Sequence, residues 1–376
     1  MEIDFQQFLA LLRSGLWNAP ADVTLFCGIT DWEAVLGHAK RQTVLGVVAE
    51  GINTLPENLQ PSKQIMNKVR EKLFSVVQMH TLLNRALEEI VATLQEQGFS
   101  PVLLKGQGVA MNYLDPTLRQ CGDIDLYIGT EDYERARTFV CQHYGNDEQG
   151  SESHKHYHFN HGWVVIELHR IAERLPMPWQ NSRFQKWTER HLHGTDLRNV
   201  RFGDTEVKLP PVDFDVIYIF NHAWHHFSAG GGIGLRQLCD WVRYLHTYHH
   251  AINLVELERN LKAFGLWHAW SIFGCVAVDI LGLPSEEFPF YRPQYFFDAC
   301  QILDMISQEG NFGVYNSDRG NRPKRYFAGK LHSFLWMNRR FIRLFPMDPL
   351  QMSAVWMNYL YIGFREVLYH KLSQVR

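Results

Sequence analysis

Two aspartates separated by one apolar residue form the most chemically informative stretch of this sequence, Gly122-Asp123-Ile124-Asp125-Leu126. Residues two apart on a β-strand point to the same face, so Asp123 and Asp125 would project together with Ile124 buried behind them. Two carboxylates that face one way repel each other unless a cation lies between them. Mg²⁺ prefers such hard oxygen ligands and usually keeps substrate phosphates as further ligands. The pair therefore predicts a magnesium site that acts on phosphates.

A third carboxylate, Glu167, lies between apolar neighbours on a later predicted strand, Ile166-Glu167-Leu168. Two metal ions about 3.5–4 Å apart can hold both the attacking and the leaving oxygen of an in-line phosphoryl displacement. Such a site needs a third acidic ligand. We expect Glu167 to bind one of two Mg²⁺ ions and to help deprotonate an acceptor hydroxyl. An Asp-x-Asp pair alone is common in solvated turns, so the prediction also depends on the groups around it.

Phosphate-binding groups are predicted on both sides of a short gap before the aspartates. Lys105 and Gly106 directly follow a predicted strand. A backbone can approach a phosphate closely at a glycine, and a lysine supplies a point charge. Arg119 precedes the aspartate pair and offers the forked donors that suit phosphate oxygens. We expect these three residues to hold a triphosphate.

Four histidines crowd a predicted hairpin. They are His154, His156, His158 and His161. A two-residue turn at 161–162 would place His156 opposite Glu167 and His154 opposite His169, all on the catalytic face. His156 and His169 are then expected to contact the nucleotide phosphate or the acceptor. Zinc is a disfavoured alternative, because one hairpin gives poor tetrahedral convergence. The plain interpretation of the remaining histidines is that they are polar side chains on a solvent-exposed hairpin.

Two residue pairs with helical spacing follow the hairpin. His222 and His226 are four apart on a predicted helix, without the Glu that a metalloprotease signature requires. A substrate-facing or packing role is favoured over metal binding. Arg236 and Asp240 have the same spacing and are interpreted as a pair that orients the site or simply supports the helix.

Apolar periodicity divides the chain into three regions. The helical patterns cover 2–16, 32–52, 62–97, 214–227 and 235–248. The strand patterns cover 101–104, 124–128, 154–159 and 163–169, with a helical pattern at 132–144. They predict an N-terminal helical region over 1–97, a mixed core with a small sheet over 98–212 and a C-terminal helical domain over 213–376. The expected fold class is α+β.

The composition is that of a globular protein with no global charge signal. Of the 376 residues 46% are hydrophobic and 20% charged, and the formal net charge is −3. This excludes a mainly disordered chain and gives no general sign of nucleic-acid binding. The six cysteines form no C-x-x-C pair, the N-terminus lacks a signal design, and the apolar stretch at 272–283 is too short to span a bilayer. We expect a cytoplasmic protein without stable membrane insertion.

The residues from 319 to 343 carry eight basic side chains and no acidic one, interleaved with aromatic residues. A solvated helix face is the plain interpretation. The alternatives are binding of the nucleotide phosphates or of an anionic acceptor, and contact with a membrane or nucleic acid. The slightly acidic overall charge disfavours the last alternative.

The motifs together resemble the DNA polymerase beta-like nucleotidyltransferase superfamily, and within it the bacterial family of uncharacterised nucleotidyltransferases. The similar features are "LLKG" ending at Gly106, then Arg119, "GDIDL" from Gly122 to Leu126, and "ELH" from Glu167 to His169. One departure from the superfamily is Gln107, which follows Gly106 where Gly or Ser is usual. The resemblance implies a nucleotidyltransferase core and adds Gly122 to the nucleotide-binding residues.

The function implied is metal-dependent transfer of a nucleoside monophosphate from a nucleoside triphosphate (NTP), such as ATP, to an acceptor hydroxyl, with release of pyrophosphate. The donor base is open, and the acceptor is a small molecule, a sugar, a protein side chain or an RNA end. Two alternatives stay open. One is a non-catalytic protein that keeps the fold and binds a nucleotide or a partner, which three intact carboxylates disfavour. The other is a kinase-like phosphotransferase with the same metal chemistry.

Overall fold

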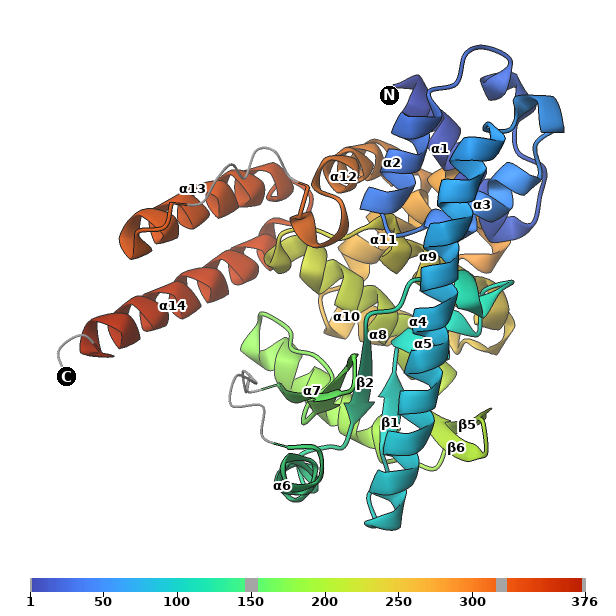
Figure 1. The fold of residues 1–376 in the computed structure, drawn as a ribbon. Helices are drawn as coiled ribbons and strands as arrows, with labels where there is room; N and C mark the ends of the chain where they lie inside the picture. The colour runs from blue at the N-terminus through green and yellow to red at the C-terminus, as the bar shows by residue number, and fades with distance from the viewer. Residues whose placement is uncertain (1, 146–154, 316–322, 374–376) are drawn as a thin grey trace.

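A six-stranded sheet and a large helical body make up the computed structural model, which describes residues 2–145, 155–315 and 323–373 (Figure 1). Helices from both ends of the chain form the body, and the long α4 (Lys63–Glu96) runs beside both the body and the sheet. The mixed sheet with helices before and after it confirms the α+β fold class. The division into three regions stays a prediction.

The N-terminal helices pack very closely. They are α1 (Ile3–Trp17), α2 (Trp32–Arg41) and α3 (Leu45–Asn53). A Cβ atom at Gly15 would lie 1.8 Å from the carbonyl oxygen of Val47, and one at Gly51 would lie 2.0 Å from that of Leu11. The backbones of α1 and α3 therefore meet directly, which only glycine permits at these two positions.

The prediction of one helix over residues 32–52 is wrong, because the chain turns between α2 and α3. Thr43 adopts a left-handed backbone with φ 55°. The preceding Gln42 is buried, and its amide donates to Ile306 O at 3.0 Å and accepts from Leu235 N at 2.8 Å. These tertiary hydrogen bonds tie the turn to the C-terminal helices and outweigh the helical pattern of the local sequence.

The sheet has the strand order β3-β4-β2-β1-β6-β5. The strands are β1 (Val102–Leu104), β2 (Asp123–Tyr127), β3 (His156–His161), β4 (Val164–His169), β5 (Arg198–Phe202) and β6 (Thr205–Leu209). The central β2 is antiparallel to β1 and parallel to β4. Ile124 and Leu126 of β2 pack in an apolar layer with α4 and α6 (Tyr133–Tyr144), so both aspartates project from the opposite face.

The register predicted for the hairpin is wrong, because the turn lies one residue later in the chain than expected. His161 pairs with Val164, so residues 162–163 form the turn, and His156 lies opposite His169 instead of Glu167. The side chain of Trp163 is 91% exposed, and the buried part of β4 begins one residue later. The partner shifts by two residues, so the faces are unchanged. His154 lies outside the described residues.

The helices after the sheet build the rest of the core. They are α7 (Pro178–Leu192), α8 (Val212–His225), α9 (Leu235–Tyr248), α10 (Leu254–Ala263), α11 (Trp267–Cys275), α12 (Phe296–Glu309), α13 (Tyr326–Leu344) and α14 (Pro349–Ser373). A π-helical turn, His226–Gly230, continues α8. One apolar cluster joins residues of α1 to residues of α8, α9, α11 and α14. α13 and α14 form a pair that projects from the body (Figure 1).

Within the described parts of the chain, no single helix has the length and apolar composition to cross a membrane. One bent pair of helices, Leu254–Ala263 with Trp267–Ile280, meets those two criteria only when taken together.

The contact between α1 and α3 predicts a strong effect of one added methyl group. We expect Gly51→Ala to lower the free energy of unfolding by about 1–3 kcal/mol, because backbone atoms must move apart. Urea unfolding measures this. The control is Gly37→Ala on α2, whose nearest heavy atom would lie 3.7 Å away, and which should be neutral or slightly stabilising. Equal stability of the Gly51 variant and the wild type would contradict the close packing.

Candidate active site

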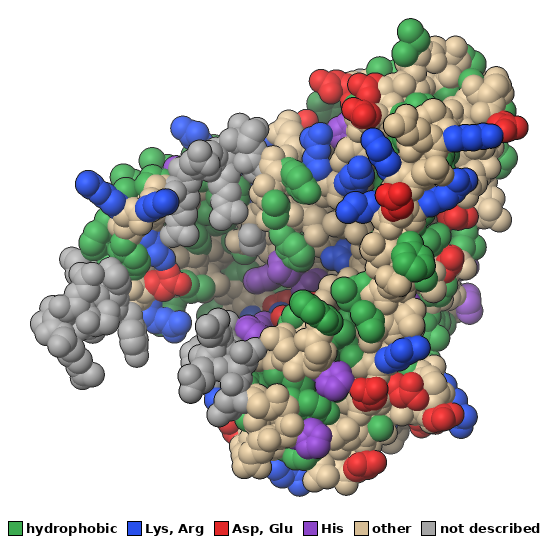
Figure 2. Space-filling view, viewed as in Figure 1, with side chains coloured by type: hydrophobic (Ala, Val, Ile, Leu, Met, Phe, Trp, Pro, Cys, Tyr) green, Lys and Arg blue, Asp and Glu red, His purple; other side chains and the backbone are tan. Residues whose placement is uncertain are grey.

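A cavity of about 260 Å³ opens between the sheet and the helices α8 and α9. Figure 2 shows the surface hollowed there, with histidine and acidic side chains in its walls. The cavity is lined by Lys105, Gly106, Val109, Arg119, Gly122, Asp123, Asp125, Lys155, His156, Glu167, Ile219, His222, His226, Arg236, Gln237, Asp240 and Phe312. All predicted site residues except His169 therefore lie at this cavity.

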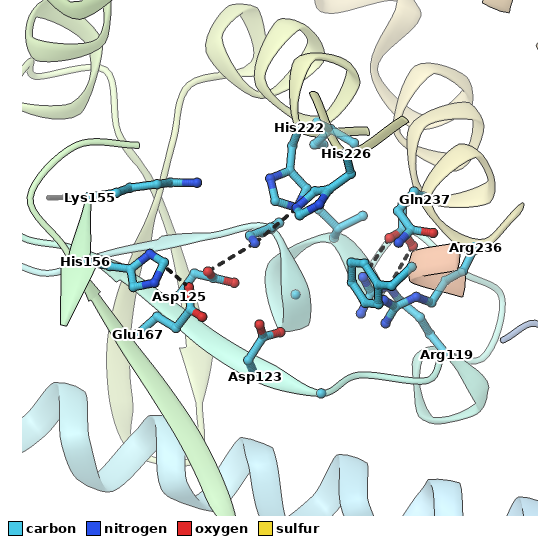
Figure 3. Close-up of a pocket in the computed structure, with 17 residues that line it drawn as sticks. Arg119, Asp123, Asp125, Lys155, His156, Glu167, His222, His226, Arg236 and Gln237 are labelled. Carbon is cyan, nitrogen blue, oxygen red and sulfur yellow. Dashed lines mark hydrogen bonds and ion pairs between the residues drawn. The ribbon is translucent and has the colours of Figure 1, made fainter. Parts of the chain in front are cut away.

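Three carboxylates converge at the base of the cavity (Figure 3). Asp123 and Asp125 project from β2, and Glu167 lies directly opposite Asp125 on the parallel strand β4. One oxygen from each of the three carboxylates lies within 4.8 Å of the others. Asp125 is fully buried, while the other two are partly exposed to the cavity. The register of two neighbouring strands thus produces the cluster.

His169 lies beneath the carboxylates. It is fully buried, and its Nε2 atom lies 2.9 Å from Asp125 Oδ1 and 3.1 Å from Glu167 Oε2. Burial alone would lower the pKa of His169, but its hydrogen bonds to both carboxylates raise it above the ordinary value. His169 was predicted to contact the nucleotide phosphate or the acceptor. Its burial instead makes it a residue that positions Asp125 and Glu167.

Lys105 neutralises the cluster from the other side. Its Nζ atom lies 3.1 Å from Asp125 Oδ1 and 3.3 Å from His222 Nε2. His222 Nδ1 in turn lies 3.3 Å from Glu173 Oε2, and Lys155 donates to the same oxygen at 2.9 Å. Because Glu173 accepts a hydrogen bond from the Nδ1–H group of His222, the Nε2 atom of that ring carries a lone pair, which faces Lys105. A chain of polar contacts therefore runs from Asp125 to Lys155.

The neighbouring charges and hydrogen bonds shift the pKa values of the three carboxylates in different directions. Burial would raise the pKa of Asp125, but Lys105 and His169 hold it well below the ordinary value. The charge of Asp125, followed by burial, raises the pKa of Asp123. Burial would also raise the pKa of Glu167, but the hydrogen bond from His169 leaves it lowered. The cluster retains negative charge that a cation in the cavity would neutralise.

Arg119 lines the cavity, but its guanidinium is engaged in a buried ion pair with Asp240. It is 6% exposed and donates to Asp240 through Nε at 2.6 Å and Nη2 at 2.7 Å. The hydroxyl of Tyr113 donates to the same carboxylate at 2.7 Å. The predicted pair of Arg236 with Asp240 is therefore not formed, because Asp240 faces the segment before β2 and holds it against α9.

Arg236 also lines the cavity, and its guanidinium is less fully engaged than that of Arg119. Its Nη1 atom donates to Gln120 O at 2.5 Å, and its Nε atom is buried without a hydrogen-bond partner among the described residues. No carboxylate of the described part of the chain lies within ion-pair distance of it. Figure 3 shows Arg236 on one side of Asp123, and Lys155 with His156 on the other. A phosphate beside Arg236 would meet an available cation.

His222 and His226 share one face of the helix, as their spacing predicts, and line the upper wall of the cavity (Figure 3). Their ring centroids are 4.5 Å apart. Burial, followed by the charge of Lys105, lowers the pKa of His226 to about 4 and that of His222 well below its ordinary value. Both imidazoles are therefore neutral at neutral pH.

The donor set fits a hard divalent cation. The oxygen Asp125 Oδ2 is buried and has no hydrogen-bond partner among the described residues. An unpaired buried oxygen is costly unless a cation completes it. Asp123, Asp125 and Glu167 offer only oxygen, as Mg²⁺ requires. His156, Glu167 and His169 form a second group within 4.8 Å, but His169 Nε2 already contacts both Asp125 and Glu167.

Several residues of the cavity carried no usable sequence signal. Lys155, Gln237 and Phe312 stand in no motif, and the fold alone brings them to the site. The basic stretch does not line the cavity in its described part. Arg340 forms a buried pair with Glu309, Lys330 contacts Glu366, and Arg343 lies 2.6 Å from Asp304. Arg319 and Arg322 lie outside the described residues.

The comparison with protein families decides the relationship of this chain. The model of a family described as uncharacterised nucleotidyltransferase matches residues 29–282. The chain belongs to this family. The resemblance to the uncharacterised nucleotidyltransferases found in the motifs is thereby confirmed. No curated protein matches the chain.

One solved structure similar to this family member is an antigenic nucleotidyltransferase-like protein from Paracoccidioides brasiliensis. The sequence identity is 11% and the TM-score 0.35, over 57% of this chain and 96% of the other.

The neutral state of His226 predicts a loss of stability in acid. Its pKa is about 4 in the folded protein and about 6.5 in an unfolded chain. Between these values the unfolded chain binds a proton that the native state excludes, so stability falls as the pH falls through this window. Chemical unfolding at several pH values between 7.5 and 4.5 measures this. His226→Gln should lose less stability over the range than the wild type.

The control for this experiment is His250→Gln, which removes an exposed histidine remote from the cavity and should leave the slope unchanged. If the His226 variant loses as much stability as the wild type, the imidazole is not held neutral by its surroundings.

Proposed function

We propose that this protein transfers a nucleoside monophosphate from an NTP to an acceptor hydroxyl and releases pyrophosphate. The observation that carries the proposal is the convergence of three carboxylates from neighbouring strands at one cavity. Membership of the nucleotidyltransferase family supports it. Cations beside these carboxylates match the phosphates of the substrate, and neither a purely structural role nor simple solvation explains three like charges in one pocket.

Asp123, Asp125 and Glu167 are the residues proposed to hold two Mg²⁺ ions. When bound, such ions supply charge stabilisation to the attacking and leaving oxygens of an in-line displacement. The orphaned Asp125 Oδ2 supports this assignment. His169 holds the second oxygen of Asp125 and one of Glu167, so that the remaining oxygens keep a fixed direction.

Residues of the chain account for the remaining chemistry. An acceptor oxygen attacks the α-phosphorus, the bond to the β-phosphate oxygen breaks, and pyrophosphate leaves with the electron pair. The acceptor proton passes to the carboxylate of Glu167, which lies at the cavity beside the other two carboxylates. Lys105 and Arg236 bind the negative oxygens of the triphosphate, and Gly106 and Gly122 leave room for them beside β2.

The acceptor is proposed to enter on the opposite side, beside Lys155 and His156. Both side chains offer N–H donors to a polar acceptor. The class of that acceptor stays open between a small molecule, a sugar, a protein side chain and an RNA end.

The proposed site predicts metal-dependent nucleotide binding. Titration calorimetry with non-hydrolysable analogues of ATP, GTP, CTP and UTP should show binding of the wild type only in the presence of Mg²⁺. Asp123→Ala/Asp125→Ala should lose it, because the oxygen ligands are gone. The control Asp196→Asn alters an exposed carboxylate outside the cavity and should bind as the wild type does.

Two outcomes would count against the proposal. A folded wild type that binds none of the four analogues would favour a non-catalytic protein. With labelled NTPs and acceptors of the four classes, transfer of label from the γ-phosphate and not from the α-phosphate would identify a kinase instead.

The guanidinium of Arg236, which pairs with no carboxylate of the described residues, predicts a specific role in phosphate binding. We expect Arg236→Ala to weaken binding of Mg²⁺-tripolyphosphate by roughly tenfold or more, as loss of a charged hydrogen bond implies, with little change in unfolding. Calorimetry with tripolyphosphate tests this. Arg183→Ala, at an exposed arginine of α7, is the matched control. Unchanged affinity of the Arg236 variant would remove Arg236 from the phosphate site.

A further inference from the structure

An aromatic ring from the C-terminal part of the chain lies in the wall of the cavity. Phe312, on the short helical turn η9 (Asn311–Gly313), lines the same space as the three carboxylates. Its side chain is 47% exposed, and most of the other residues that line the cavity are polar or charged. An apolar ring that faces a polar cavity presents a flat surface for a ligand.

The backbone at this ring is held in an unusual conformation. Phe312 has φ 55°, in the left-handed region that bulky residues rarely adopt. Gly310 and Gly313 on either side have φ 62° and 66°. A Cβ atom at Gly313 would lie 2.0 Å from Gly231 O, so two glycine-containing loops meet backbone to backbone. This contact keeps Phe312 from relaxing away from the cavity.

Two polar contacts fix the loop on both sides of the ring. The amide of Gln237 donates to Asn311 Oδ1 at 3.1 Å. Glu309 forms a buried ion pair with Arg340 of α13. Arg340 also donates through Nε to Phe227 O at 3.1 Å, in the π-helical turn that carries His226.

The ring of His226 therefore has a fixed place relative to Phe312. Their centroids are 5.4 Å apart, and the planes meet at 71°. The two rings thus meet edge to face at one corner of the cavity, while 47% of Phe312 stays exposed. Burial and Lys105 keep His226 uncharged at neutral pH, so this corner is suited to a planar, uncharged group.

We propose that the exposed ring of Phe312 stacks against the base of the donor nucleotide, an inference that rests on the proposed function. The position of Phe312 favours the donor over the acceptor. Asn311 accepts a hydrogen bond from Gln237, the neighbour of the proposed phosphate ligand Arg236. Gln237 and Arg236 lie on the side of Asp123 away from Lys155 and His156 (Figure 3). The base and the phosphates then lie on one side.

The surroundings of the ring give the stacking a defined selectivity. The amide of Gln237 is engaged at both ends, because its oxygen accepts from Gly234 N at 3.2 Å and its nitrogen donates to Asn311. These two contacts and its burial, 8% exposed, hold the amide against the loop and the start of α9, which limits its reach toward the edge of a base. Stacking accepts every base and strengthens with ring area. We therefore expect the site to favour purines over pyrimidines.

The test measures binding of Mg²⁺ complexes of non-hydrolysable ATP and CTP analogues and of inorganic tripolyphosphate. Phe312→Leu keeps an apolar side chain without a flat face, and Phe312→Trp keeps the face. The control Phe345→Ala removes a ring of nearly equal exposure, 48%, that lies at another groove. Circular dichroism and thermal unfolding establish whether each variant is folded. If Phe312→Leu does not fold, Phe312→Trp provides the test.

The expected result is that Phe312→Leu weakens binding of the ATP analogue by roughly 5- to 150-fold, the range for loss of one stacked base. Its affinity for tripolyphosphate should not change, and Phe312→Trp and Phe345→Ala should bind as the wild type does. Equal affinity of wild type and Phe312→Leu for the ATP analogue would overturn the stacking proposal, as would a folded Phe312→Trp that has lost nucleotide but not tripolyphosphate binding. A wild type that binds neither nucleotide nor tripolyphosphate would overturn the proposed function, and the stacking proposal with it.

Discussion

The repulsion between Asp123, Asp125 and Glu167 is the constraint around which the rest of this structure is arranged. Parallel pairing of β2 and β4 forces the last two to face each other, and burial makes their mutual charge more costly than it would be in water. Lys105 contacts Asp125 from one side, and His169 contacts it from beneath. Lys105 and His169 both contact Oδ1 of Asp125 and leave its buried Oδ2 without a hydrogen-bond partner among the described residues, which is where we propose that a cation binds.

The neutralising groups are themselves held in place by a further layer of contacts. His222 orients Lys105, and Glu173 orients His222. These residues come from segments far apart in the sequence, since the turn after β1, the loop after β4 and α8 each supply one. The site is therefore a product of the whole chain. The C-terminal helices contribute in the same way, because the buried pair of Arg340 and Glu309 supports the loop that carries Phe312.

The sequence was sufficient to predict the parts of the site that depend on local spacing. The strand around Ile124, the carboxylates and the shared face of His222 and His226 followed from periods of two and 3.6 residues. Strand pairing was harder, because nothing in the local sequence shows that Trp163 lies in the turn and not in the strand. The turn at Gln42 was equally hidden, since its cause is a pair of hydrogen bonds to distant helices.

Ion pairing was the least predictable feature, and it bears on which substitutions relatives can carry. Spacing alone suggested a pair within one helix, whereas Asp240 reaches across to Arg119 and Tyr113. A buried carboxylate left without its guanidinium is strongly destabilising, while an apolar pair in the same space can be neutral. A substitution at only one of the two positions would therefore be destabilising. Among relatives, changes at 119 and 240 should therefore occur together, as a linked substitution from a charged pair to an uncharged one.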